Sequence, residues 1–323
     1  MSGTDVSVVV CAHDERRWRE IGAALRALEE QTLPVHEVVV VVDNNERLLK
    51  RIRSELGAVA IANSYAPGLG GARNSGLAAT SGAVVAYLDD DAAAVPGWLA
   101  SITAPYADPL VAGVGGSAEP AWETERPGWF PAEFDWVIGC SYRGLPHTAE
   151  EVRNLFGCNM SFRRSLLEEL GGFRLGYGCD ETEFCIRLRQ RWPEKKLLYV
   201  PAAKVKHYVP ASRTRPRRFL ARCYFEGGSK AVVSRLVGRE QGLASELYYT
   251  RYVLPAGARR GLTDFGRHGD PAGLGRAAAI VGGLTSTGLG YLTGRLMIRR
   301  AASRRGWQGS FVSSTHRSEP AGA

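Results

Sequence analysis

Cysteine is scarce in this sequence and shows no regular spacing. The 323 residues include six cysteines, no two of which form a C-x-x-C pair. Small secreted domains held by disulfides have denser and more regular cysteine patterns. The pattern therefore argues against a disulfide scaffold and favours reduced, partly buried thiols, as in a cytosolic protein. The six are Cys11, Cys140, Cys158, Cys179, Cys185 and Cys223.

Long apolar runs are also missing. The first apolar stretch, residues 6–12, is shorter than the core of a signal peptide and has no basic residues before it, so we expect a cytoplasmic protein. Residues 277–294 are uncharged, but five glycines and four Ser or Thr residues make them a weak candidate for a membrane span. We favour a helix packed on the domain or on a partner over a helix lying on a membrane surface.

Acidic residues are few in the last third of the chain. Residues 201–323 contain 21 Lys and Arg against 6 Asp and Glu, whereas residues 1–200 contain 20 against 27. The net charge of +8 therefore comes from the C-terminal part. Because a basic region attracts phosphate groups, this division suggests two regions with different partners.

Apolar runs and amphipathic segments alternate through the first 90 residues. Continuous apolar runs predict strands buried on both faces, and apolar residues three or four positions apart predict helices. This alternation predicts an α/β fold with a parallel sheet and crossover helices. We expect strands at residues 6–11, 33–43, 58–63 and 83–91, helices at 18–28 and 46–56, and a glycine-rich loop running into a helix at 68–81.

Polar clusters follow three of the expected strands: AHDE at residues 12–15, DNN at 43–45 and DDD at 89–91. Ligands of parallel α/β sheets bind beyond the carboxyl ends of the strands, so these clusters mark the expected site. The three adjacent aspartates would repel one another unless a cation is present. A divalent metal bound with a diphosphate removes this conflict, whereas a helix cap or a solvated turn would explain one aspartate but not three.

The glycine-rich segment GLGGARNSGL, residues 68–77, precedes the fourth expected strand. Glycines allow a close approach of backbone to ligand, and Arg73 offers a fork of donors for a phosphate or a base. The segment lacks the G-K-[ST] ending of a P-loop and does not follow the first strand, as a Rossmann fingerprint would. Taken alone, it is equally consistent with a turn before a helix.

The middle of the chain is less regular. Residues 105–146 are rich in Trp, Pro and Gly, and we expect a loop region that faces substrate. Its tryptophans, Trp122, Trp129 and Trp136, either stack on a sugar or pack within the loop.

Later segments return to regular patterns, and beyond about residue 219 the pattern is helical and basic. We expect a strand and helix in residues 155–173, a helix in 179–191 and a pair of strands in 196–209.

Seven segments occur in a particular order: CAHDE, VVVDNN, GGARNSGL, YLDDD, GCNMSFRR, CDETEFCIRL and VKHYV. Each is modest alone, but together, over residues 5–215, they resemble the inverting glycosyltransferases of family 2. The resemblance implies the GT-A fold, a nucleotide-binding α/β sandwich with a mixed, mainly parallel central sheet flanked by helices. Here a basic helical extension follows it.

The resemblance also implies roles for residues of the nucleotide site. His13 and Glu15 would border the base and ribose, and Asp43 would hydrogen-bond the base. Arg73 and Asn74 would line the nucleotide pocket.

The aspartate triplet resembles the D-x-D motif of the family. Asp89 and Asp90 would lie toward the ribose and diphosphate, and Asp91 would bind Mn²⁺ or Mg²⁺, with Asp89 as a further metal ligand. His207 resembles a late histidine that completes the metal shell, although a lone histidine after a strand is otherwise a common surface residue. Asn159 would lie beside the donor sugar and the acceptor.

The expected catalytic base is where the sequence departs from the family. Many relatives carry Glu-Asp at the start of this helix, with the aspartate as base, whereas here Asp180 precedes Glu181. Glu181 occupies the position of the base and Asp180 has its residue type; we favour Glu181 and keep Asp180 as the alternative. Without the resemblance, acids complementing the helix dipole would explain the pair. Glu183 is expected to pair with Arg187.

The basic segment at residues 213–230 has two interpretations. It closes over the donor diphosphate, with Arg213 as the candidate, or it forms a solvated helix face that contacts anionic partners. We divide the chain into a GT-A catalytic domain, residues 1–218, and a basic, mainly helical region, residues 219–323, whose tail from about residue 308 is expected to be disordered. The basic region is the candidate for peripheral contact with the inner face of a membrane.

These features predict a metal-dependent inverting glycosyltransferase that moves a sugar from a nucleoside diphosphate sugar, most often UDP in this family, to a hydroxyl or amine. The acceptor, whether natural product, glycolipid or polysaccharide precursor, stays open, as does oligomerisation, and no nucleic acid is expected. One alternative is a nucleotidyltransferase, which usually has a glycine-rich loop where this chain has AHDERR. The other is an inactive binding module of the same fold, against which the complete set of carboxylates argues.

Overall fold

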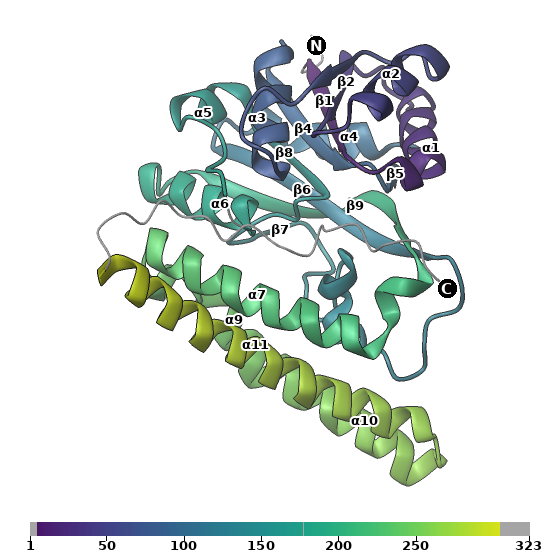
Figure 1. Cartoon of the computed structure of the whole chain (residues 1–323), viewed down its shortest axis with the longest axis vertical. Helices are drawn as coiled ribbons and strands as arrows, with labels where there is room; N and C mark the ends of the chain where they lie inside the picture. Colours follow the sequence, from purple (N-terminus) through teal and green to yellow (C-terminus); the bar gives the residue numbers. More distant parts are fainter. Residues whose placement is uncertain (1–4, 177, 304–323) are drawn as a thin grey trace.

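A computed structural model describes residues 5–176 and 178–303 of the chain (Figure 1). In this part, nine strands form one sheet in the order β3-β2-β1-β4-β8-β6-β9-β5, with β7 paired to β9. The pairs among β1 to β4 and between β6 and β9 are parallel, and the others are antiparallel. The sheet is therefore mixed, as expected. The strands are β1 (Val6–Ala12), β2 (Glu37–Val42), β3 (Ala60–Ala62), β4 (Val84–Asp89), β5 (Ala92–Ala94), β6 (Val111–Trp122), β7 (Glu150–Glu151), β8 (Asn159–Arg163) and β9 (Lys196–Val209).

The strand β1 is mainly apolar because the sheet lies between two layers of helices. All seven of its residues are buried, and since successive side chains of a strand point to opposite faces, they divide between two cores. Val8 and Val10 belong to one core, and Val9 and Cys11 to the other.

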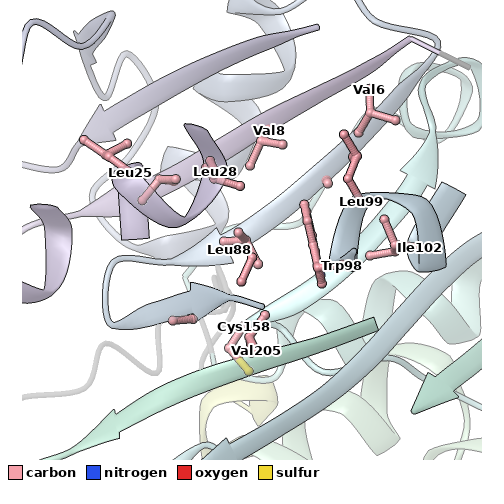
Figure 2. Close-up of a cluster of buried hydrophobic side chains, with 14 of the residues drawn as sticks. Val6, Val8, Leu25, Leu28, Leu88, Trp98, Leu99, Ile102, Cys158 and Val205 are labelled. Atoms are coloured by element: carbon pink, nitrogen blue, oxygen red, sulfur yellow. The ribbon is translucent and has the colours of Figure 1, made fainter. Parts of the chain in front are cut away.

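Helices cover both faces of the sheet. The first core receives apolar residues of α1, α2 and α4, part of which Figure 2 shows around Val8, Leu28 and Trp98. The second core receives those of α3, α5 and α6. This three-layer arrangement confirms the predicted α/β class. The helices are α1 (Trp18–Glu29), α2 (Glu46–Glu55), α3 (Leu69–Ala79), α4 (Trp98–Thr103), α5 (Arg164–Glu169) and α6 (Asp180–Arg191).

The helix predicted within residues 68–81 is present as α3, but it begins at Leu69 and contains most of the glycine-rich segment that the sequence suggested was a loop. Gly71 and Gly76 allow close packing of this helix and do not form a turn. A Cβ on Gly76 would lie 2.3 Å from Val9 Cγ1, and one on Gly71 would lie 2.0 Å from the Ala66 carbonyl oxygen. These glycines let α3 approach β1 and its own preceding loop.

Two further expectations were wrong. Residues 196–209 form the single strand β9 instead of a strand pair, because it pairs with β6 past an irregularity opposite Gly116 and Ala118. Residues 105–146 are not mainly loop: they include β6, the short helix η3 (Ala132–Ile138), and the fully buried Phe130 and Phe134.

The C-terminal helices lie under the sheet domain, with α11 on the far side of α7 (Figure 1). A third core of aromatic residues joins η3 to α7, and Trp122, Trp129 and Trp136 pack against it, in line with the packing alternative. The uncharged residues 277–294 lie inside α11, packed on α7 and α10. The helices are α7 (Pro216–Val237), α8 (Arg239–Gly242), α9 (Ala244–Tyr248), the π-helix η5 (Tyr249–Val253), α10 (Leu254–His268) and α11 (Pro271–Ser303).

None of the helices in the described part of the chain is both long and apolar enough to cross a membrane. All six cysteines are free, and five of them are buried. The expected tail from residue 308 lies outside the described residues. The division near residue 218 stays a prediction; α7 begins close to it, at Pro216.

Candidate active site

Asp89, Asp91 and His207 come together at the carboxyl end of β4. Asp89 ends β4, Asp91 precedes β5, and β5 pairs with β9 so that Ala92 lies opposite His207. His207 Nε2 lies 3.2 Å from Asp91 Oδ1 and 4.0 Å from Asp89 Oδ2. One ligand atom from each of the three residues lies within 4.8 Å of the others.

The donor atoms of this group fit a divalent cation. Asp91 and His207 are buried, and Asp91 Oδ1 and His207 Nδ1 have no hydrogen-bond partner in the described structure. Buried polar atoms without partners are costly, and a cation bound by two carboxylates and an imidazole would satisfy Asp91 Oδ1. The three predicted metal ligands are therefore placed where they could act together.

Two arginines relieve the repulsion within the aspartate triplet. Arg213 Nη2 donates to Asp91 Oδ2 over 2.9 Å, and Arg17 Nη1 lies 3.3 Å from the same oxygen and donates to Asp90 Oδ1. Burial raises the pKa of Asp91, but His207, Arg213 and Arg17 outweigh it and hold this pKa well below its usual range. Arg213, the candidate for closing over a diphosphate, thus lies at the predicted metal site.

Asp90 differs from its two neighbours. Its carboxylate is buried against Arg17, and burial raises its pKa to about 7 despite that arginine. Its predicted contact with the ribose or diphosphate stays a prediction. We did not foresee the role of Arg17; the available signal was its position just after β1, whose residue Cys11 pairs with Asp89.

The predicted base residues begin α6 and share Arg73. Arg73 Nη1 donates to Asp180 Oδ2 over 2.9 Å and lies 3.6 Å from Glu181 Oε2, while Nη2 donates to the Gly157 carbonyl oxygen over 3.1 Å. Asp180 is buried, whereas the Glu181 side chain is 20% exposed. Burial, together with the neighbouring Asp180, raises the pKa of Glu181 to about 7.

Arg73 also connects the two acidic groups electrostatically. Burial lowers the pKa of this guanidinium, but Asp180, Glu181 and Asp89 outweigh burial and raise it above its ordinary value. Asp89 therefore interacts electrostatically with Arg73, the same cation that pairs with Asp180 and Glu181. The same arginine bonds Gly157, two residues before Asn159, which pairs with Leu88 at the end of β4, so both acidic groups lie at the same edge of the sheet.

Three predicted nucleotide-binding residues lie just beyond β1 and β2. Asp43 accepts hydrogen bonds from the Gly68 backbone N–H and the Asn63 side chain, which ties β2 to the start of α3. Glu15 Oε2 lies 3.3 Å from Arg47 Nε. The His13 carbonyl oxygen accepts a hydrogen bond from the side chain of Asn45, at the start of α2. Contact of His13, Glu15 and Asp43 with a nucleotide stays a prediction.

Two predicted asparagines have their amides engaged inside the protein. Asn74 bonds both the N–H and the carbonyl oxygen of Phe173. Asn159 is fully buried; its amide donates to the carbonyl oxygens of Ser117 and Ala203 and accepts from the Trp98 indole. Both position backbone, and nothing in their geometry favours their predicted roles in donor binding.

A glycine that the sequence gave no reason to single out lies against the predicted metal ligand. Gly139 has φ +81°, and a Cβ there would lie 2.9 Å from Cε1 of His207. The glycine thus leaves room for the imidazole.

Residues 7–171 match the family model described as Glycosyl transferase family 2. The chain belongs to this family. It is 34% identical over 244 residues to a glucosyl-dolichyl phosphate glucuronosyltransferase of Haloferax volcanii, covering 72% of this chain and 78% of that one. It is 29% identical over 245 residues to a pre-mycofactocin glycosyltransferase of Mycobacterium tuberculosis, covering 72% of this chain and 48% of that protein.

Solved structures agree on the fold. A mannosyltransferase from Pyrobaculum calidifontis, in complex with GDP-Man and Mn²⁺, superposes with a TM-score of 0.56 at 20% identity, covering 90% of this chain and 86% of that one. The family 2 chain accordingly has the GT-A fold, and it is a glycosyltransferase, as the sequence predicted.

Proposed function

We propose that this family 2 glycosyltransferase is metal-dependent and inverting, and that it moves a sugar from a nucleoside diphosphate sugar to a hydroxyl or amine. The observation that carries the proposal is the convergence of Asp89, Asp91 and His207 at the edge of the sheet where Arg73 also holds Asp180 and Glu181. One end of the site suits a metal and a diphosphate, and the other suits a proton acceptor. The Mn²⁺ and GDP-Man in the mannosyltransferase structure support this division.

Asp91, His207 and Asp89 would hold the metal. Bound Mn²⁺ or Mg²⁺ would supply a Lewis acid that stabilises negative charge on the leaving diphosphate. Arg213 and Arg17 already lie against Asp91 and would add positive charge beside the diphosphate.

Glu181 is the favoured base. Asp180 is buried and bonded to Arg73, whereas Glu181 is partly exposed and its raised pKa of about 7 suits a base at neutral pH. In the transfer step, the acceptor oxygen forms a bond to the anomeric carbon as the bond from that carbon to the diphosphate oxygen breaks. The acceptor proton passes to Glu181, and the nucleoside diphosphate leaves with the electron pair.

The donor and acceptor follow from the family and from the relative with the higher identity. We propose UDP as the donor nucleotide. Because the Haloferax volcanii relative is named for a glucosyl-dolichyl phosphate, we propose the hydroxyl of a lipid-linked sugar as the acceptor class.

The test is the release of nucleoside diphosphate from a panel of nucleotide sugars, with and without Mn²⁺. We expect release with UDP sugars only when metal is present, and loss of release in Asp91→Asn, which keeps the side-chain shape. NMR of the transferred sugar should show inversion at the anomeric carbon. Pyrophosphate release would support the nucleotidyltransferase alternative, and absence of both donor hydrolysis and nucleotide binding would support an inactive binding module.

A further inference from the structure

The helix α11 carries a row of exposed apolar side chains. Val281, Leu289 and Leu292 are 61%, 54% and 56% exposed, respectively. Most members follow one another by three, four, five or seven residues, which places most of the row on one side of the helix. Its members are Leu274, Val281, Leu284, Leu289, Leu292, Leu296 and Met297, and we call them the α11 row.

The opposite side of α11 packs against α7 and α10, in several places through glycines. A Cβ on Gly290 would lie 1.9 Å from the Tyr224 carbonyl oxygen, and one on Gly294 would lie 3.0 Å from the Ala231 side chain. A Cβ on Gly273 would likewise lie 2.4 Å from the Gly261 carbonyl oxygen of α10. In a helix exposed only to water, the larger apolar residues would face the protein. Here most of them face outward.

The α11 row is long for a surface feature of a soluble protein. From Leu274 to Met297 it extends about 35 Å at 1.5 Å per residue. Leu262 and Phe265 of α10 are exposed as well, as are Leu220 and Tyr224 of α7. Exposed apolar side chains gathered on neighbouring helices in this way favour a site of association. In Figure 1, α11 runs along the edge of the molecule farthest from the sheet, where a flat surface could reach it.

The charges around the α11 row indicate which kind of partner would bind it. The sequence of α11 contains no Asp or Glu, and arginines stand at both ends of its uncharged stretch: Arg276, which pairs with Asp264 and Asp270, and Arg295. Exposed arginines on α7 and α10 add to this positive charge; they are Arg217, Arg218, Arg222, Arg259 and Arg267. A long apolar row among basic residues matches an anionic lipid surface, which offers both an acyl layer and negative headgroups.

We propose that the α11 row binds the surface of a bilayer that contains anionic phospholipid. The apolar side chains enter the boundary between headgroups and acyl chains, and the surrounding arginines contact the headgroups. The helix lies along the membrane, since no described helix suits a span. This inference does not depend on the proposed transfer reaction, because it concerns a surface formed by other helices.

The test is flotation of the full chain with vesicles of phosphatidylcholine, alone or mixed with phosphatidylglycerol. We expect binding to the mixed vesicles that weakens with salt, and about tenfold weaker binding to the neutral ones. The double variant Leu289→Glu and Leu292→Glu should bind the mixed vesicles at least about tenfold more weakly. The matched control is the double variant Leu33→Glu and Val59→Glu, which places the same two charges at apolar residues of the sheet domain that are 46% and 64% exposed and should bind like the wild type.

Thermal unfolding and nucleotide binding of each variant establish that it is folded. Failure of the wild type to float with mixed vesicles would overturn the proposal, as would unchanged binding by the double variant. A second copy of the chain is the competing occupant. A wild-type dimer in solution that the double variant converts to monomer, without vesicle binding by either protein, would assign the row to that dimer.

Discussion

Arg73 donates a 2.9 Å hydrogen bond to Asp180 and so distinguishes it from the carboxylate that follows. Asp180 is buried with this cation, and the pair is matched in charge. Glu181 lies farther from the guanidinium and is partly exposed. The inverted order of the two acids therefore puts the partner of Arg73 first and leaves the second acid partly exposed.

The first prediction separates these two roles. Glu181→Gln should lower kcat by about a thousandfold, since it removes the general base, and should leave nucleotide binding unchanged. Asp180→Asn should instead lower the free energy of unfolding by about 3 kcal/mol, because it leaves the buried Arg73 with a weaker partner. Steady-state kinetics and urea unfolding measure the two effects. A larger kcat loss in a stable Asp180→Asn protein would make Asp180 the base.

The second prediction concerns pH. The pKa of Glu181 is raised to about 7, chiefly by burial, and the base must be ionised to accept a proton. The transfer rate should therefore be low in weak acid and rise through about pH 7 to a plateau. The measurement is kcat/KM against pH with metal held saturating. A flat profile between pH 6 and about 8 would contradict the assignment.

The raised pKa of Glu181 also makes the free energy of unfolding depend on pH. A carboxyl whose pKa is raised on folding holds its proton more tightly in the folded state, so its contribution to stability is present below the unfolded pKa and is lost as pH rises through about 7. Because glutamine does not ionise, Glu181→Gln removes this loss of stability at higher pH. At pH 8 the variant should be more stable than the wild type by about 1 to 3 kcal/mol, given about 1.4 kcal/mol per pKa unit, and near pH 4 the difference should vanish.

Much of the fold could be predicted because the first strands carry their own signal. The run of β1 does not alternate, since both of its faces are buried, and acids at the ends of parallel strands must meet at one edge of the sheet. That is why a metal site could be proposed from Asp89 to Asp91, whereas Glu181 and Asp180, which begin α6, were proposed as the base only from the resemblance to family 2.

The parts that could not be predicted depend on partners far apart in the chain. The amide of Asn159 bonds carbonyl groups more than 40 residues away in the sequence, and its expected place beside the donor sugar stays a prediction. The close approach of Gly76 to Val9 is likewise visible only once α3 lies on β1. Local pattern marks such residues as unusual without saying what they touch.

The third prediction tests the metal ligands without enzyme turnover. With Mn²⁺ present, a nucleoside diphosphate at a hundredfold its Kd should raise the free energy of unfolding by about 2.7 kcal/mol. His207→Ala should lose most of the part that depends on Mn²⁺, because it removes a donor beside Asp91. His147→Ala changes an exposed histidine and serves as the control. Equal metal-dependent stabilisation in both variants would exclude His207 as a ligand.

The fourth prediction concerns the aromatic core between η3 and α7. The Phe219 ring centroid lies 5.3 Å from that of Phe134 and 5.5 Å from that of Phe130, and the ring is buried. Phe219→Ala should cost about 3 to 5 kcal/mol in unfolding free energy. Its neighbour Leu220 is exposed, so Leu220→Ala should change this free energy by less than about 0.5 kcal/mol. Similar costs for the two variants, measured by urea unfolding, would mean that the aromatic core contributes little to stability.

The fifth prediction perturbs the metal site without removing a ligand. Gly139 and Gly97 have nearly the same backbone conformation, with φ of +81° and +82°. Alanine is strained at both positions, but its Cβ would lie 2.9 Å from the His207 ring at position 139 and would meet nothing within 4 Å at position 97. Gly139→Ala should therefore displace the imidazole and weaken Mn²⁺ binding by about tenfold or more, as changes beside metal ligands do, while Gly97→Ala keeps the wild-type affinity. Both should lose similar stability from backbone strain, so isothermal titration with Mn²⁺ and a nucleoside diphosphate isolates the contact with His207. Equal affinities would show that the imidazole position does not limit metal binding.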